Sequence, residues 1–258
     1  MKTLSKLAIL ALILAFLYHG CEKDPLQPDK NTLRISKIAR NSEMIDPIYV
    51  FEYNEKGLLT RITGDWVEDY ISITYNDEDL PIKIFEKSEF EADNKTIDIV
   101  WEENSYTTTT GTYDIYTDTY HFDSQGRIDS YSYSSYNASF DETYTRNFEV
   151  VWDDKEMNFY QLNDGSEREW IQTRKYNENK NPMQAINYAI LNEFELTYVL
   201  ADYGITFQQD LCVSMHHCED EGVGTYEYEY NEDGYPISVL ILREDYGPTY
   251  YYFEYESD

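Results

Sequence analysis

Basic residues are scarce in this chain of 258 residues, which has 20 Lys and Arg against 50 Asp and Glu and a formal charge of −30. Nucleic-acid binders gain affinity from Lys and Arg that neutralise phosphates, so a chain with a pI near 4.3 is not expected to bind nucleic acid. Docking on anionic lipid through a basic face is excluded for the same reason. Glycine and proline, at 11 and 7, are too few for a collagen-like or low-complexity chain.

Recognisable catalytic motifs are also missing. The sequence has no Gly-x-Ser-x-Gly, no His-Glu-x-x-His and no phosphate-binding loop. Without a nucleophile and a base at interpretable spacing, we predict that the chain is not an enzyme and expect no cofactor and no metal. The 50 acidic residues guarantee close carboxylate pairs, so a carboxylate-dependent glycan hydrolase is the alternative.

The sequence lacks an apolar run of the roughly 20 residues that cross a bilayer. Its one clear apolar run, from Leu7 to Tyr18, is shorter. It follows Lys2 and Lys6 and precedes Gly20-Cys21, which resembles the lipobox of a lipoprotein signal. We therefore predict a signal peptide at 1–20 and a lipidated Cys21. The alternative is a secretory signal followed by an ordinary cysteine.

Downstream of Cys21 we predict a tether over 21–32 and a single β-repeat domain over 33–258. Glu22-Lys23-Asp24 resembles the short acidic export signal of surface lipoproteins of the Bacteroidota type. This favours attachment to the outer membrane by a lipid anchor, facing the cell surface or the periplasm.

Aromatic residues are abundant, at 16% of the chain with 27 Tyr, which argues against disorder. A degenerate pattern of strand, tight turn and strand recurs at 51–62, 73–84, 121–128 and 228–239. An Asn or Asp follows an aromatic residue, and Gly57, Gly126 and Gly234 stand where the turn needs positive φ. Asp79 replaces the glycine in one copy. Gly64 and Gly111 lie outside the pattern and are expected to tolerate a Cβ better.

Alternating residues on both sides of these turns predict an all-β fold, an antiparallel meander of repeated hairpins forming a curved sheet or partial barrel. We expect ten to fourteen strands. Two longer hairpins are predicted, pairing 97–101 with 113–122 and 131–136 with 144–152. Near 183–191, after Asn181-Pro182, apolar residues at helical spacing predict one short helix, with an irregular loop as the alternative.

The turns resemble tyrosine-aspartate (YD) repeats. Together with the lipoprotein signal, Asn181-Pro182 and the segment 230–236 (Tyr-Asn-Glu-Asp-Gly-Tyr-Pro), they resemble a domain-of-unknown-function family of secreted Bacteroidota lipoproteins described as porin-like. The resemblance covers roughly residues 45 to 258. It implies a curved meander or partial barrel and no established activity.

Two further cysteines, Cys212 and Cys218, enclose a segment with His216 and His217. In an exported protein such a pair favours a disulfide. Free thiols, or a metal site that adds both histidines, are the alternatives.

The tyrosine runs are the remaining functional resource. Exposed rings on a concave sheet suit a glycan or protein ligand, whereas cross-strand ladders of rings would serve stability alone. The function predicted from the sequence is therefore a non-enzymatic binding or scaffold module whose ligand-binding residues are unknown. The tyrosines in question are Tyr113, Tyr116, Tyr120, Tyr131, Tyr133, Tyr136, Tyr226, Tyr228, Tyr230, Tyr250, Tyr251 and Tyr252.

Overall fold

The structure is a computed structural model of the chain that describes residues 33–64, 67–88, 94–163, 167–180, 186, 210–217, 223–243 and 246–256. These ranges contain sixteen β-strands and no helix. The first eight strands are β1 Arg34–Ala39, β2 Tyr49–Tyr53, β3 Leu59–Gly64, β4 Val67–Tyr75, β5 Pro81–Lys87, β6 Lys95–Glu102, β7 Ser105–Thr110 and β8 Ile115–Phe122. The others are β9 Ile128–Asn137, β10 Glu142–Asp153, β11 Glu156–Leu162, β12 Arg168–Lys180, β13 Asp210–His217, β14 Val223–Tyr230, β15 Pro236–Arg243 and β16 Tyr246–Glu256.

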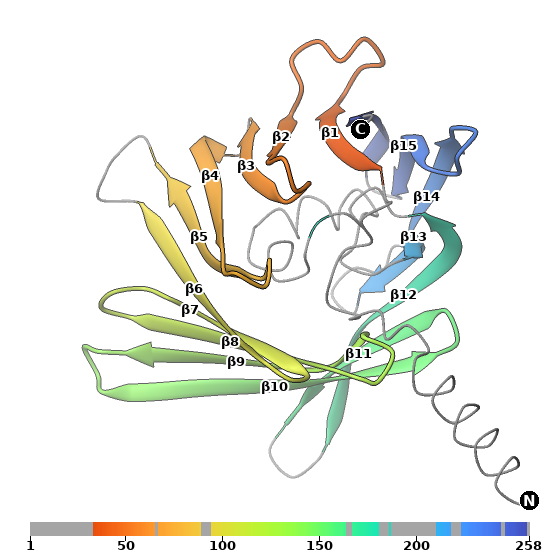
Figure 1. Cartoon of the computed structure of the whole chain (residues 1–258). Helices are drawn as coiled ribbons and strands as arrows, with labels where there is room; N and C mark the ends of the chain where they lie inside the picture. The colour runs from red at the N-terminus through yellow and green to blue at the C-terminus, as the bar shows by residue number, and fades with distance from the viewer. Residues whose placement is uncertain are drawn as a thin grey trace, which may run out of the picture.

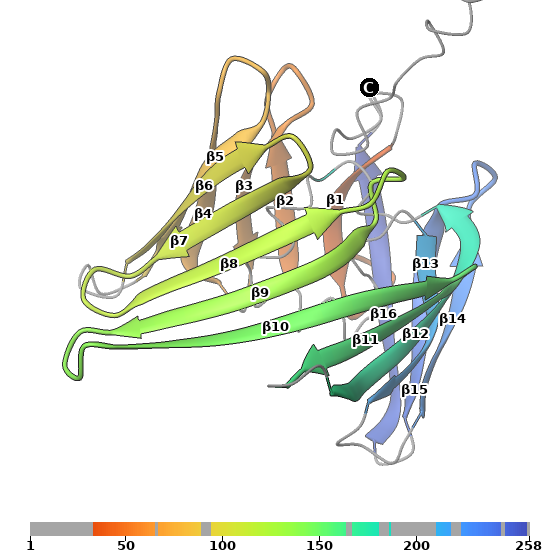
Figure 2. The same cartoon turned by 90° about the horizontal axis from the view of Figure 1, so that it is seen from below.

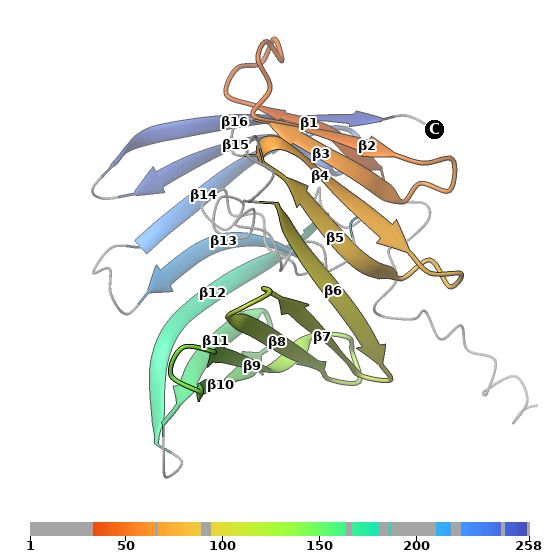
Figure 3. The same cartoon turned by 90° about the vertical axis from the view of Figure 1, so that its left-hand side faces the viewer.

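Each strand pairs antiparallel with the next along the chain, and β1 also pairs with β16, so the meander closes into a barrel (Figure 1). Figure 2 shows β9 and β10 reaching beyond their neighbours as a long hairpin. In Figure 3 the wall runs from β1 through β6 to β10 and back through β12 to β16. The all-β antiparallel prediction is confirmed. Closure goes beyond a partial barrel and leaves neither end strand with an unpaired edge.

The four repeat turns share one hydrogen-bond pattern. In the turn after β2, the Asn54 side-chain oxygen accepts from the backbone N–H of Lys56 and Leu58, both at 3.0 Å. The backbone N–H of Asn54 donates to the Leu58 carbonyl at 2.9 Å, and that of Gly57 donates to the Asn54 carbonyl at 2.8 Å. The turns that begin at Asn76, Asp123 and Asn231 repeat all four bonds, at 2.8 to 3.1 Å.

The fourth residue of each turn has positive φ. Gly57, Gly126 and Gly234 have φ of 78°, 75° and 81°. Asp79 adopts the same conformation at φ 62°, which a short polar residue tolerates better than others. The Asx oxygen and the left-handed residue therefore define the repeat at the level of geometry.

A second regularity is an aromatic residue at the last or next-to-last position of an even-numbered strand. Its polar tip donates to a backbone carbonyl at the start of the preceding odd strand. The pairs are Tyr53 with Ile35 at 2.9 Å, Tyr75 with Leu59 at 2.7 Å, Trp101 with Pro81 at 2.7 Å, Trp152 with Ile128 at 2.9 Å and Tyr255 with Pro236 at 2.6 Å. We call these five residues the aromatic clamps.

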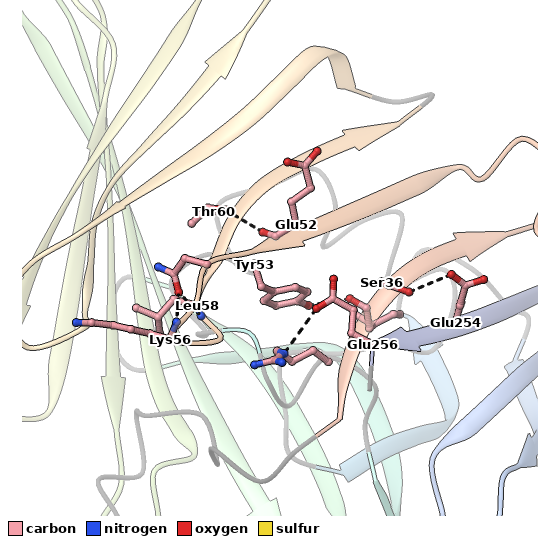
Figure 4. Close-up of polar contacts among 11 residues, drawn as sticks. Ser36, Glu52, Tyr53, Lys56, Leu58, Thr60, Glu254 and Glu256 are labelled. Atoms are coloured by element: carbon pink, nitrogen blue, oxygen red, sulfur yellow. Dashed lines mark hydrogen bonds and ion pairs between the residues drawn. The ribbon is translucent and has the colours of Figure 1, made fainter. Parts of the chain in front are cut away.

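Tyr53 shows the surroundings of a clamp (Figure 4). Its ring lies beside Glu256 of β16. The Arg34 guanidinium packs on the face of the ring, 5.7 Å from its centre. Burial, and then the Glu256 carboxylate, raise the pKa of Tyr53 above its ordinary value. Burial likewise raises the pKa of Tyr75 and Tyr255. The hydroxyls therefore stay protonated and remain donors.

The buried face of the wall is mainly isoleucine and aromatic residues at alternate positions. One continuous cluster includes Ile38, Ile62, Ile84, Tyr106 and Val239, each at 1% exposure or less. In a closed barrel this face points inward. A wall of sixteen strands is too wide for its own side chains to fill. Ile186, from the segment between β12 and β13, is 2% exposed and belongs to the same cluster.

The outward face carries polar and charged side chains together with exposed apolar ones such as Val100, at 62% exposure, and Tyr250, at 48%. Ion pairs cross neighbouring strands there: Lys37 with Glu254 at 2.6 Å and Lys83 with Asp98 at 3.3 Å.

Two of the finer predictions were wrong. Sixteen strands exceed the expected ten to fourteen. The segment 97–101 pairs with β7 rather than with 113–122, because Glu103 and Asn104 turn the chain immediately and the threonine run 107–110 forms a strand of its own. The pairing of 131–136 with 144–152 is confirmed. The predicted helix near 183–191 lies outside the described residues, except Ile186.

Candidate functional site

Six aromatic rings form a row across the inward face of β6–β11. The rings follow one another at centroid distances of 5.0, 4.8, 4.8, 5.2 and 5.1 Å. The first pair is tilted and the other four are stacked. The row consists of Trp101, Tyr106, Tyr120, Tyr131, Phe148 and Phe159, one from each strand. We call it the aromatic row.

The aromatic row stabilises the wall. Aromatic pairs contribute about 0.5–1.5 kcal/mol beyond the area they bury, and here the pairs join six consecutive strands. Because each stacked ring covers the face of its neighbour, the row offers little free ring surface to a ligand. The ladder interpretation of the tyrosine runs thus applies to this part of the wall.

Asp118 stands next to this row on the inward face of β8, and Tyr131 of β9 donates a hydrogen bond to its carboxylate. Burial raises the pKa of Asp118, while the Tyr131 hydroxyl and Lys95 oppose this effect without cancelling it. Asp118 is thus a half-buried acid at the border between the aromatic row and solvent.

A more exposed group follows along the same face, towards the β9–β10 hairpin tip. Tyr116 stacks on Tyr133 at 6.5 Å, and its side chain is 38% exposed. Tyr144 is 51% exposed, and the Arg146 guanidinium lies over its ring at 5.2 Å. Register places Arg146 beside Tyr133, and Tyr133 beside Asp118. These five residues form what we call the inner polar group: Tyr116, Asp118, Tyr133, Tyr144 and Arg146.

This arrangement combines ring surface, hydroxyl groups, one carboxyl and one guanidinium on a single wall. Such a set can stack on a sugar ring or a side chain while it exchanges hydrogen bonds with hydroxyls. A glycosidase needs a second carboxyl within about 5–9.5 Å of the first. On β8–β10 the next inward carboxylate is Glu142, four residues beyond Arg146, roughly 14 Å along the strand at 3.4 Å per residue. Along β8–β10 the inward carboxyl groups are therefore farther apart than that pair requires.

The residues predicted from the sequence lie elsewhere. Gly57, Gly126 and Gly234 occupy turns at the opposite ends of the strands from the β9–β10 tip. Cys21 and Cys218 lie outside the described residues. For Cys212 the structure describes the backbone, which pairs with Tyr176. The proposed disulfide is therefore still a prediction.

Of the tyrosines singled out in the sequence, Tyr226 and Tyr251 are buried, at 4% and 6% exposure, whereas Tyr113 and Tyr250 are exposed, at 63% and 48%. Sequence reasoning missed Asp118 and Arg146. The sequence pattern that could have identified Asp118 is Tyr116-x-Asp118-x-Tyr120. Alternate residues of a strand share a face, so the acid lies on the same face as the two tyrosines.

In the described ranges, no three His, Cys, Asp or Glu side chains come together in a group that could hold a metal ion. Within the same ranges, no helical segment has the length and hydropathy to cross a membrane.

The chain was compared with known proteins. No protein-family model matches it, and no curated protein does. Among solved structures it is similar to a porin-like protein from Bacteroides vulgatus ATCC 8482, at 11% identity and a TM-score of 0.46, with 88% of this chain and 100% of that chain covered. It is also similar to a porin-like protein from Bacteroides uniformis ATCC 8492, at 14% identity and a TM-score of 0.42, with 90% and 99% covered.

Proposed function

We propose that this protein is a non-enzymatic binding module that takes a glycan on the inner polar group. The observation that carries the proposal is the position of Asp118, a half-buried carboxyl bonded to Tyr131 and bordered by partly exposed tyrosines. Sugars present hydroxyls that both donate and accept, together with apolar ring faces. A carboxyl, a guanidinium and tyrosine rings match both features.

We also propose where the protein is located in the cell. Lipidation at Cys21 would anchor the chain to the outer membrane, because acyl chains contribute about 0.8 kcal/mol per buried methylene. The tether 21–32 would then hold the barrel in the aqueous phase beside the membrane. The ion pairs on the outward face, such as Lys83–Asp98, support this placement. Replacing Cys21 with Ser should release the protein into the soluble fraction and abolish palmitate labelling.

A glycan array and a pull-down with the soluble form from residue 22 test the binding function. We expect glycan hits that are lost in Asp118→Ala and in Tyr144→Ala. Tyr75→Phe, an aromatic clamp outside the inner polar group, is the matched control and should keep them. Hits that persist in both Ala variants would contradict the proposed site. A protein partner captured in place of any glycan would contradict the ligand class.

Hydrolysis is tested with the same glycans. Release of new reducing ends by the wild type, lost in Asp118→Asn, would make the protein a hydrolase. We expect no release.

A further inference from the structure

Arg174 is a buried cation on the inward face of the barrel wall. It lies on β12, where its Cα partners are Met157 of β11 and Met215 of β13. Its side chain shares a face with Met157 and Tyr176, which are 2% and 5% exposed and belong to the core cluster. Arg174 itself is 8% exposed. A guanidinium therefore stands in a largely apolar part of the wall.

The guanidinium is almost without partners. Nη2 donates to the Gln172 side-chain oxygen at 3.4 Å, at the long limit for a hydrogen bond. Nε and Nη1 are buried and have no hydrogen-bond partner in the part of the chain that the structure describes. In contrast, Arg127 and Arg168 make ion pairs at 2.8 Å, with Asp123 and Glu149.

Such a group is costly to bury. An ion removed from water loses hydration worth several kcal/mol, and a neutral amide 3.4 Å away restores little of it. Burial is tolerated when an anion takes the place of water. The N–H of Nε, both N–H groups of Nη1 and the second N–H of Nη2 are the donors left for that anion, and a fork for a carboxylate pairs Nη2 with Nε or with Nη1.

We propose that Arg174 is a binding site for one carboxylate of a ligand that enters the barrel. The planar guanidinium fork matches a carboxylate in geometry. A single buried cation neutralises a monoanion, whereas a phosphate dianion would need a second. Asp118 lies on β8, four strands away and about 19 Å at 4.8 Å per strand. The anion site is thus separate from the inner polar group and goes beyond the proposed function.

The test measures thermal unfolding of the purified full-length protein, kept in mild detergent, with glucuronate as the probe. Glucose and phosphate at matched ionic strength are the comparison solutes. We expect the wild-type Tm to rise with the logarithm of glucuronate concentration above Kd. Glucose should leave it unchanged, and phosphate should raise it less than glucuronate does. An equal rise with glucose, or a larger one with phosphate, would overturn the assignment.

Variants separate this site from a general charge effect. Arg174→Met should unfold at the wild-type Tm or above it, because an apolar side chain of similar length replaces an unpaired buried charge. It should also lose the glucuronate-dependent shift. Arg40→Met removes one positive charge from an exposed turn and should keep the shift.

Arg174→Lys covers the case in which Arg174→Met does not fold. It keeps the charge but lacks the planar fork, so glucuronate should bind at least about tenfold more weakly than to wild type. Wild-type affinity in Arg174→Lys, or an unchanged shift in Arg174→Met, would show that Arg174 does not hold the carboxylate.

Discussion

Asp118 and Asp123 lie five positions apart and have opposite pKa shifts. Burial raises the pKa of Asp118, and the Tyr131 hydroxyl only partly offsets this. Burial acts in the same direction on Asp123, but hydrogen bonds from the Arg127 backbone and guanidinium outweigh it and lower the pKa. The charged form of Asp118 therefore costs stability in the fold, whereas the charged form of Asp123 contributes it.

The Asp118 shift gives a pH-dependent prediction. A raised folded pKa means that the cost is absent below the unfolded pKa of about 3.9 and appears as pH rises through the folded pKa. Asp118→Asn, which keeps an acceptor for Tyr131, should therefore be more stable than wild type at pH 7. The difference should vanish below about pH 4. Urea unfolding of both proteins at several pH values measures it.

Asp123→Asn is the matched opposite. It keeps the turn acceptor but loses the charged pair with Arg127, so it should be less stable at pH 7 by less than about 1 kcal/mol. The gap should close as pH falls through the lowered folded pKa. If both asparagine variants shifted stability in the same direction at pH 7, the electrostatic account of this pair would be wrong.

The structure predicts a different ranking of the glycine substitutions, by loss of stability, from the one that the sequence suggests. A Cβ at Gly234, with φ 81°, meets nothing within 4 Å, so Gly234→Ala should cost only the backbone strain of about 1–2 kcal/mol. Gly111 has φ 98°, and its Cβ would lie 1.9 Å from the Asp114 carbonyl oxygen. Gly111→Ala should therefore cost more. Gly247→Ala is the control and should change stability by less than about 0.5 kcal/mol.

Chemical denaturation of the three variants ranks them. The expectation that Gly64 and Gly111 tolerate a Cβ better was wrong, because a carbonyl oxygen stands 2.0 Å from the Cβ position of Gly64 and 1.9 Å from that of Gly111. Close approach of two backbones leaves no sequence pattern. A Gly234→Ala variant less stable than Gly111→Ala would contradict the steric argument.

At the scale of the element, four hairpins have the repeat turn at their tight end, and at two of these turns the preceding residue is an aromatic clamp, Tyr53 or Tyr75. The turns follow from local chemistry, so residues 54–57 and 231–234 could be placed from the sequence. The clamp bond joins residues 16 to 24 positions apart and depends on register between strands. Register is set by packing of the whole wall, so local pattern did not predict it.

Tyr75→Phe tests the clamp. The change removes only the hydroxyl that donates to the Leu59 carbonyl at 2.7 Å and leaves the ring in place. It should lower the free energy of unfolding by about 0.5–1.5 kcal/mol. Tyr255→Phe should do the same, and the double variant should be additive because the two clamps lie on distant strands.

The control for the clamps is Tyr250→Phe, whose side chain is 48% exposed, and it should be neutral. Phe122 occupies the same position at the end of β8 but has no side-chain donor. Its backbone N–H donates to the Asn104 carbonyl. A neutral Tyr75→Phe would reduce the clamps to hydrophobic packing.

At the scale of the whole molecule, the sequence predicts the class of fold but not its closure. Repeated hairpins allow an open sheet as well as a ring. Closure depends on pairing between β1 and β16, with partners such as Ile38 and Phe253 that are 215 positions apart. The inner polar group could not be predicted from the sequence for the same reason, because only the register between strands brings Asp118, Tyr133 and Arg146 together. In a sequence with 50 Asp and Glu and 27 Tyr, charge and hydropathy alone do not single out these residues.

Closure decides whether the proposed sites face an interior, and it can be measured directly. Lys37 and Glu254 are Cα partners on the outward face of β1 and β16. In the form from residue 22 with Cys212 and Cys218 replaced by Ser, Lys37→Cys with Glu254→Cys should form an intrachain disulfide on mild oxidation, seen by mass spectrometry. Thr74→Cys with Lys83→Cys, partners within one hairpin, is the positive control. A disulfide in both double-cysteine variants, 37 with 254 and 74 with 83, would confirm the closed barrel. A disulfide in the 74–83 control with free thiols at 37 and 254 would contradict closure.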